Sequence, residues 1–200
     1  MPHIHTRPGD HDWTVSAHIV WACGGEPRVL FHRHKSLGRW LQVGGHVEVG
    51  ETPWAAVAHE VAEESGYRLA DLAVLQPPLR LRAVGPEAVL HPVPVCLSTH
   101  RFGDGSDHYH TNLCFALLAA GPPDRGPAAG ESHELRWLTA GELAGLPPRE
   151  VFGDAVAIAL HVLGEVLPAW EPVPASLFSL AAGPVKPSNP GEPDARSGVG

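Results

Sequence analysis

Three glutamates at positions 60, 63 and 64 have a spacing that allows them to act together. On a helix, at about 100° per residue, this i, i+3, i+4 pattern makes the carboxylates of Glu60, Glu63 and Glu64 neighbours. Like charges at this spacing destabilise a helix by about 0.2–0.5 kcal/mol per pair, and residues 52–65 include no Lys or Arg to offset them. Two interpretations are open: a solvated acidic face, or a site whose clustered oxygens bind a hard divalent cation such as Mg²⁺ or Mn²⁺.

The helix that would carry these glutamates has clear start and stop signals. Thr52 is a favourable N-cap, and Pro53 occupies the first helical position, where a missing N–H costs nothing. Gly66 follows the last turn and suits the left-handed conformation that closes many helices. We therefore predict a helix over residues 52–65, with an apolar stripe roughly opposite the glutamates. The stripe consists of Trp54, Val57, Ala58 and Val61.

Two glycines, Gly44 and Gly45, come before this helix, and Glu51 immediately precedes its cap. Adjacent glycines indicate a backbone that turns sharply or approaches another group closely. The whole segment resembles the signature of the Nudix hydrolases, G-x5-E-x7-R-E-U-x-E-E-x-G-U, in which U is a bulky apolar residue. Eight of the nine defined positions match over 23 residues, and His59 stands where the family has Arg. The matches are Gly45, Glu51, Glu60, Val61, Glu63, Glu64, Gly66 and, more loosely, Tyr67.

The resemblance implies a fold, an activity and a cofactor. Nudix hydrolases cleave a diphosphate linkage in a nucleoside diphosphate attached to another moiety, and their fold is an α/β/α sandwich around a mixed β-sheet. Mg²⁺ would be the cofactor, with Mn²⁺ as a substitute. By this resemblance the metal ligands would be the carbonyl of Gly44 and the carboxylates of Glu60, Glu63 and Glu64. Structural support of the motif would come from Gly45, Glu51, His59 and Gly66, with Glu51 orienting the helix through its partner at position 59.

A second interpretation from another class is a Nudix-fold nucleotide-binding or regulatory domain that does not hydrolyse. The retention of all three helix carboxylates and of Glu51 favours the enzyme, because a binding module has no need to keep like charges adjacent. A third interpretation, a structural domain with an acidic helix face, would make the motif a coincidence.

His59 is the clear departure from the family pattern. Arg is permanently charged, whereas His is charged only near or below about pH 6.5 unless its neighbours raise the pKa. The acids around His59 should raise that pKa. We hypothesise that His59 partly replaces the arginine by pairing with Glu51 or Glu63, and that activity is retained.

Hydrolysis also needs a group that takes a proton from the attacking water. In Nudix enzymes this acid often lies in the loop before the last sheet strand, which here corresponds to residues 130–137. Glu131 and Glu134 are the candidates, and solvated loop acids are the alternative. We prefer Glu131, because an acid about six residues before a tryptophan, here Trp137, recurs in the family.

Several residues outside the motif are candidates for substrate binding. Arg39 could hold a phosphate and Trp40 could stack on a base, with a surface position and core packing as the alternatives. His46 lies beside the expected metal site and could contact a phosphate, with a solvated loop histidine as the alternative. His108 and His110 share one face of a predicted strand and could bind a transition metal, or simply line the substrate cleft.

The elements expected to position these residues form a mixed α/β domain. Strands are predicted over residues 14–21, 28–32, 40–44, 94–102, 112–119 and 135–138, and a second helix over 150–167. This irregular alternation favours a mixed sheet with helices on both faces. We divide the chain into a flexible N-terminus (1–9), a Nudix domain (10–170) and a Pro/Gly-rich, largely disordered tail (171–200), in which segment 176–181 could dock on the domain.

Composition limits the partners. With 22 acidic against 14 basic residues the net charge is −8, which argues against binding nucleic acid or an anionic membrane. A small-molecule nucleotide or nucleotide derivative is therefore the expected partner, and a homodimer is left open. The absence of a long apolar run or signal-peptide core, together with three cysteines without metal-type spacing, favours a cytoplasmic protein. The excess of Arg over Lys, twelve to two, is typical of a GC-rich bacterial genome.

Overall fold

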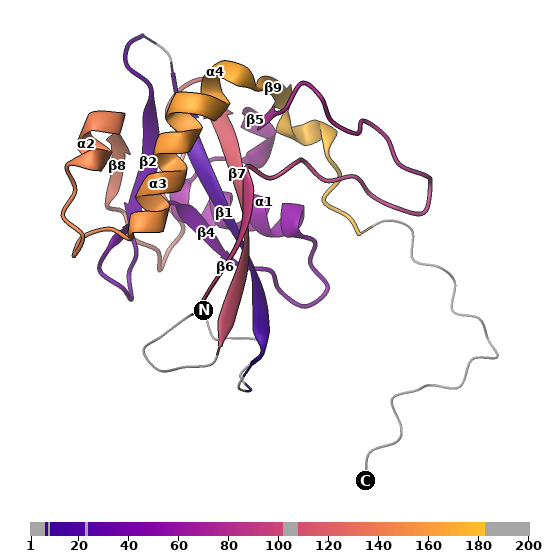
Figure 1. The fold of residues 1–200 in the computed structure, drawn as a ribbon, viewed down its shortest axis with the longest axis horizontal. Helices are drawn as coiled ribbons and strands as arrows, with labels where there is room; N and C mark the ends of the chain where they lie inside the picture. Colours follow the sequence, from indigo (N-terminus) through magenta and orange to yellow (C-terminus); the bar gives the residue numbers. More distant parts are fainter. Residues whose placement is uncertain (1–6, 8, 23, 102–107, 183–200) are drawn as a thin grey trace.

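The computed structural model describes residues 7, 9–22, 24–101 and 108–182. This part of the chain forms a nine-stranded sheet with helices packed on it (Figure 1). The strands are β1 His11–Trp21, β2 Arg28–Arg33, β3 Trp40–Leu41, β4 Val43–His46, β5 Leu72–Gln76, β6 Cys96–Arg101, β7 Tyr109–Ala119, β8 Leu135–Leu138 and β9 Glu171–Pro174. The helical elements are α1 Pro53–Ser65, α2 Ala140–Ala144, α3 Gly153–His161, α4 Leu167–Ala169, the 3-10 turns η1 Leu69–Asp71 and η3 Ala175–Leu177, and the π-turn η2 Val162–Val166.

The sheet is mixed, as predicted. Its two long strands, β1 and β7, run parallel and stay in register from His11 opposite Tyr109 to Trp21 opposite Ala119. The other strand pairs are antiparallel. On the side of β1 away from β7, two strands pair with β1. β2 pairs with the C-terminal end of β1, and β4 pairs with its middle, where Ala17 lies opposite Val43. This divided edge brings the glycine pair of β4 alongside β1.

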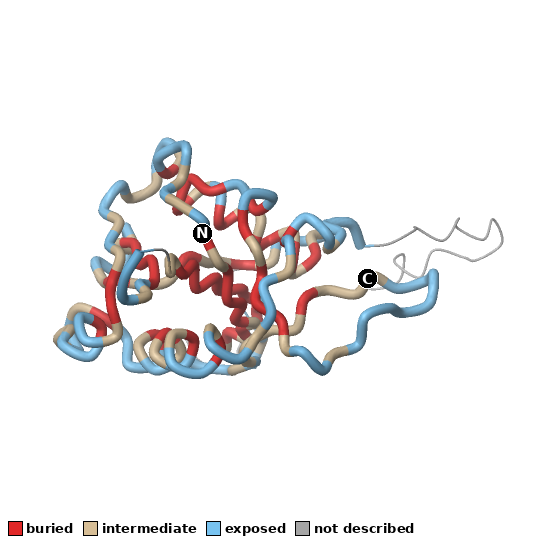
Figure 2. Tube along the Cα trace, turned by 90° about the horizontal axis from the view of Figure 1, so that it is seen from above, coloured by how far each residue is buried: buried red, intermediate tan, exposed pale blue. Residues whose placement is uncertain are grey.

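Helices cover both faces of the sheet, which confirms the predicted α/β/α sandwich. Side chains alternate between the two faces along a strand. From β1, Val15 and Ile19 belong to the core that includes Trp54 of α1. Val20 belongs to the second core, with Ala159 of α3. In Figure 1, α3 lies in front of the sheet and α1 behind it, and Figure 2 shows the buried residues concentrated between the layers.

Besides the short 3-10 turns η1 and η3, the elements β5, α2 and β9 were not predicted. β9 lies at the sheet edge and pairs with β5, so its two prolines are tolerated there. Prolines are rare in strands, so the sequence pattern of β9 does not predict a strand. α2 begins at a capping box in which Thr139 and Glu142 bond each other's backbone. The second predicted helix begins at Gly153 rather than residue 150 and continues through η2 to Ala169.

The first residues of the predicted tail, 171–182, include β9 and η3, and Phe178 packs against the core beneath α1. The ring of Phe178 lies 6.1 Å from that of Trp54, and the Thr52 hydroxyl donates a hydrogen bond to the Leu180 carbonyl at 2.9 Å. The predicted docking of segment 176–181 is therefore confirmed, since apolar burial offsets the cost of ordering it. The remainder of the predicted tail, residues 183–200, and most of the predicted N-terminal segment lie outside the described residues.

Two further observations concern membrane-spanning helices and cysteines. Of the helices that the structure describes, none combines the length and apolarity needed to cross a membrane. Cys114 is buried and Cys96 is half-buried, and both are free thiols; Cys23 lies outside the described residues.

Candidate active site

Helix α1 is capped at both ends as the sequence predicts. The Thr52 hydroxyl accepts a hydrogen bond from the Ala55 N–H at 3.1 Å, and Pro53 occupies the first turn. Gly66 closes the helix with φ of 79°. A Cβ at Gly66 would also overlap the carbonyl of Arg125. A residue with a side chain is therefore disfavoured there by both backbone conformation and space.

The glutamates of α1 do not lie on one solvated face. Glu60 and Glu64 are buried, with 2% and 6% of their surface exposed, whereas the Glu63 side chain is 45% exposed. The glycines of β4 make this burial possible: the Glu60 carboxylate occupies the space where a Cβ of Gly45 would stand, and the Gly44 N–H donates to Glu64 Oε2 at 2.8 Å. The predicted placement of the carboxylates opposite the packed side was wrong for Glu60 and Glu64, because Gly44 and Gly45 of β4 have no side chains to fill the space beside α1.

Burial changes the protonation of both acids. Desolvation raises the pKa of Glu60 to about 7 and that of Glu64 to about 9. His32 Nε2 lies 3.4 Å from Glu64 Oε2, but burial lowers the pKa of His32 to about 4, so this histidine is neutral at pH 7. Within the described part of the chain, Glu60 Oε1 is buried without a hydrogen-bond partner. These oxygens fit a hard divalent cation, which would supply the missing positive charge.

His59 connects two acidic side chains. Its Nε2 lies 3.1 Å from Glu63 Oε1 and its Nδ1 3.7 Å from Glu51 Oε1. Burial alone would lower the pKa of His59, but the carboxylates of Glu63, Glu60 and Glu51 together raise it above its ordinary value. Glu51 also accepts a hydrogen bond from the Glu48 N–H at 3.1 Å. The structure therefore pairs His59 with both of the acids between which the sequence left the choice open.

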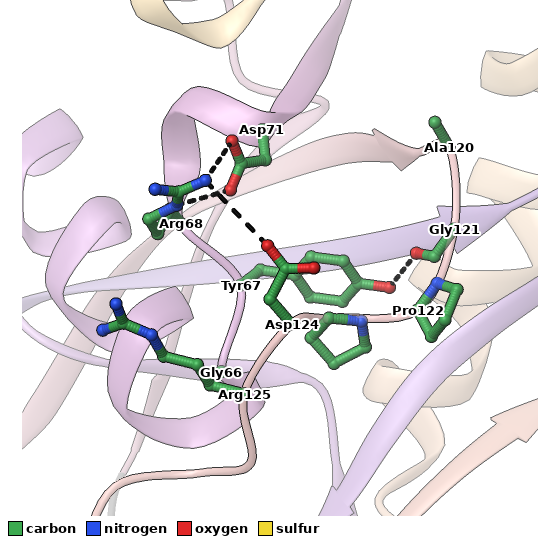
Figure 3. Close-up of a pocket in the computed structure, with 10 residues that line it drawn as sticks. Gly66, Tyr67, Arg68, Asp71, Ala120, Gly121, Pro122, Asp124 and Arg125 are labelled. Atoms are coloured by element: carbon green, nitrogen blue, oxygen red, sulfur yellow. Dashed lines mark hydrogen bonds and ion pairs between the residues drawn. The ribbon is translucent and has the colours of Figure 1, made fainter.

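Glu131 is brought towards the carboxylates by a loop anchored on the end of α1. The Tyr67 hydroxyl donates to the Gly121 carbonyl at 2.5 Å (Figure 3), and the Ala128 N–H donates to the Glu63 carbonyl at 2.7 Å. The charge of Glu131 contributes to the raised pKa of both Glu60 and Glu64. Glu134, the other loop candidate, is exposed and makes no such contribution.

Comparison with known proteins identifies the family. The family model described as the NUDIX domain matches residues 12–160. The chain belongs to the Nudix family. A Mycobacterium tuberculosis protein named "Putative 8-oxo-dGTP diphosphatase 2" is 60% identical to this Nudix chain over 107 residues, which cover 52% of this chain and 63% of the relative. The match therefore spans less than two thirds of that relative.

Solved structures share the Nudix fold. A hydrolase of the NUDIX family from Clostridium perfringens has a TM-score of 0.59 and 25% identity, and the match covers 77% of this chain and 97% of that one. The dihydroneopterin triphosphate pyrophosphohydrolase of E. coli has a TM-score of 0.53 and 20% identity, covering 84% and 100%. The second likeness supports the fold alone.

The residues proposed for substrate contact occupy different environments in this Nudix domain. Trp40 is 2% exposed and packs in the core beside α3, so its ring is not available to stack on a base. The Arg39 guanidinium lies 4.3 Å from the centre of the Phe152 ring. His46, His108 and His110 gather around Asp12 of β1. Sequence analysis missed Asp12, because the register of β1 on β7 brings it to these histidines.

A surface pocket of about 340 Å³ lies at the end of the Nudix helix, next to Gly66 (Figure 3). Its Arg68 is held by Asp71 at 2.7 Å and lies 4.0 Å from Asp124. None of Glu60, Glu63 and Glu64 is among the residues that line it. The pocket does not provide the chemistry of the Nudix motif.

The raised pKa of Glu64 predicts that the metal-free Nudix domain loses stability between pH 7 and 9. The folded state holds the Glu64 proton up to about pH 9, whereas the unfolded state releases it at about pH 4.3. The protonated carboxyl therefore stabilises the folded state at low pH, and this contribution to the free energy of unfolding is lost as the pH rises through the folded pKa. Above about pH 6.5 the buried His18 and His32 are neutral in both states, so they do not contribute to the change of stability with pH. Urea unfolding at pH 7, 8 and 9 measures the effect.

Two comparisons isolate the contribution of Glu64. The variant Glu64→Gln should show a smaller fall in the free energy of unfolding, because its amide does not titrate. Saturating Mg²⁺ should also reduce the fall in the wild type, since a bound cation favours the ionised carboxylate. A wild type whose stability changes with pH in the same way as that of Glu64→Gln would contradict the assignment.

Proposed function

We propose that this chain is a Mg²⁺-dependent pyrophosphohydrolase that cleaves a diphosphate linkage in a nucleoside diphosphate attached to another moiety. The observation that carries the proposal is the burial of Glu60 and Glu64 beside the half-exposed Glu63. Burying two carboxylates without a cationic partner is unfavourable, so a fold that retains them is suited to a divalent ion. The family membership of the chain and the name of its mycobacterial relative support the reaction class.

The proposed roles follow from the positions of the side chains. Glu60, Glu63, Glu64 and the carbonyl of Gly44 would hold Mg²⁺, or Mn²⁺ in its place. When bound, such ions neutralise charge on phosphate oxygens and lower the pKa of an attacking water. Glu63 is kept in place by His59, which in turn is held by Glu51. Gly45 and Gly66 support this arrangement because a side chain at either position would displace Glu60 or the loop at Arg125.

Oxidised nucleoside triphosphates are the first substrates to test, because the relative that is 60% identical over 107 residues is named for 8-oxo-dGTP. The screen should also include ADP-ribose, dinucleoside polyphosphates and nucleotide sugars. We expect release of a phosphate-containing product from at least one compound, and loss of that release when Mg²⁺ is removed by chelation. Lack of both turnover and Mg²⁺ binding would contradict the enzyme, whereas nucleotide binding without turnover would favour a regulatory domain.

We predict that Glu131 accepts the proton of the attacking water. General-base catalysis contributes about 10²–10⁴-fold to a rate, so Glu131→Gln should lower kcat by at least about 10²-fold with little change in KM. Glu134→Gln is the matched control, because it makes the same change three residues along the loop. Equal effects of the two substitutions on kcat would contradict the role of Glu131.

We predict that His59 substitutes for the arginine of the family motif. Its two acidic neighbours keep it charged more often than an isolated histidine. His59→Arg should therefore leave kcat within a few-fold of the wild type, whereas His59→Ala should lower it by freeing Glu63. Steady-state kinetics of both variants provide the test. A turnover much greater than that of the wild type in His59→Arg would show that His59 is a defect rather than a substitute.

A further inference from the structure

A second group of metal-binding side chains lies on the face of the sheet opposite α1. Val15 of β1 packs in the core beneath α1, so Asp12, three residues earlier, projects from the other face. His110 is the register partner of Asp12, and His46 is the partner of Thr14. Since residues 12 and 14 share a face, β1, β4 and β7 each contribute one of these side chains to the same region.

The three side chains converge closely. Asp12, His46 and His110 each offer one ligand atom, and these atoms lie within 4.8 Å of one another. His46 Nε2 is 3.6 Å from Asp12 Oδ2, and the rings of His46 and His110 are 4.9 Å apart. All three are buried, and Asp12 has no exposed surface. Bonds from zinc to nitrogen or oxygen are about 2.0–2.2 Å long, so small side-chain rotations would bring the three atoms onto one ion.

The donor set distinguishes this group from the glutamates of α1. Two imidazoles and one carboxylate suit a transition metal, whereas Mg²⁺ prefers oxygen ligands and water. Three protein ligands leave a position open for water or another small ligand, as in zinc sites of the His₂-carboxylate type. We propose that Asp12, His46 and His110 form a Zn²⁺ site, separate from the Mg²⁺ site proposed on α1.

His108 is the positioning residue of this site. Its Nε2 lies 3.3 Å from Asp12 Oδ2, and its ring stands perpendicular to that of His110 at 5.3 Å. A hydrogen bond from His108 to the carboxylate would fix the orientation of Asp12. Groups that orient metal ligands in this way change metal affinity by about 10–100-fold.

The test is metal binding by the full-length chain after removal of metals with a chelator. In a large excess of Mg²⁺, we expect the wild type to bind one Zn²⁺ per chain at this site, and Co²⁺ in its place to give visible d–d absorption. His110→Ala and Asp12→Asn should weaken Zn²⁺ binding by more than about 100-fold, and His108→Gln by about 10–100-fold. His161→Ala, which removes an exposed histidine of α3, should bind like the wild type.

Further measurements distinguish Zn²⁺ binding at this site from binding at the glutamate site and from the effect of a variant that fails to fold. Glu63→Gln should retain Zn²⁺ binding at the histidine site even if it abolishes hydrolysis, so failure of the proposed function does not decide this inference. X-ray absorption of the Zn²⁺-loaded wild type should show two imidazoles, which requires no variant to fold. An all-oxygen shell, Zn²⁺ binding no tighter than that of Mg²⁺, or unchanged binding by folded His110→Ala would overturn the proposal.

Discussion

Glu63→Gln is expected to lower kcat for Mg²⁺-dependent diphosphate hydrolysis by about 10²–10³-fold, the range seen when one group that stabilises developing charge is removed. The amide has nearly the shape of the carboxylate but no negative charge to hold a cation. Because the Glu63 side chain is 45% exposed, the free energy of unfolding should change by no more than about 0.5 kcal/mol. Steady-state kinetics and urea unfolding of the same preparation measure both effects.

The control for this experiment is Glu165→Gln, which makes the same chemical change at an exposed position of η2. It should leave both kcat and stability at the wild-type values. A raised Mg²⁺ requirement in Glu63→Gln would further connect the lost activity to metal binding. If Glu63→Gln kept more than a third of the wild-type kcat at saturating Mg²⁺, the proposed role of Glu63 would be wrong.

Trp54→Ala is expected to lower the free energy of unfolding by about 3–5 kcal/mol, the usual cost of removing a large aromatic side chain from a core. Trp54 has no exposed surface, and its ring lies 5.4 Å from that of Phe115 in β7 and 6.1 Å from that of Phe178. It therefore joins the Nudix helix to both the sheet and the C-terminal segment. The shift of the urea midpoint, with the slope unchanged, measures the cost.

Trp13→Ala is the matched control, since Trp13 is 50% exposed on β1. Its loss should cost much less than that of Trp54. In Trp54→Ala we also expect hydrolysis to fall, because the cavity loosens the packing that holds the glutamates against β4. A cost below about 1 kcal/mol for Trp54→Ala, against the larger value that a fully buried ring requires, would show that α1 is not anchored in this way.

Several features of the candidate site follow from local sequence signals. The limits of α1 depend on Thr52, Pro53 and Gly66, whose effects on the backbone act within a few residues and do not need the rest of the fold. The strand β8 was predicted with its observed bounds, Leu135–Leu138. The mixed sheet with helices on both faces follows from the order of such elements. The motif residues were found for the same reason: their spacing lies within one loop and one helix.

The burial of the glutamates could not be predicted from the helix alone. On a helical wheel Glu64 lies only about 20° from Val57, at the edge of the apolar stripe, and Glu60 about 60° from Val57. The wheel contains no information about which neighbour covers that side. Only the pairing of β4 with β1 brings Gly44 and Gly45 against α1. The missing side chains of these glycines leave the space that the carboxylates occupy.

The sequence by itself determined the Nudix motif, the caps of its helix and the acids available for metal binding, because these depend on short-range spacing. Tertiary structure decided which acids are buried, that Trp40 belongs to the core, and that Asp12 meets His46 and His110. Asp12 and His110 are about a hundred positions apart in the sequence and meet through the parallel pairing of β1 and β7. A shift of one residue in that register would turn Asp12 to the opposite face from His110, and no local signal specifies it.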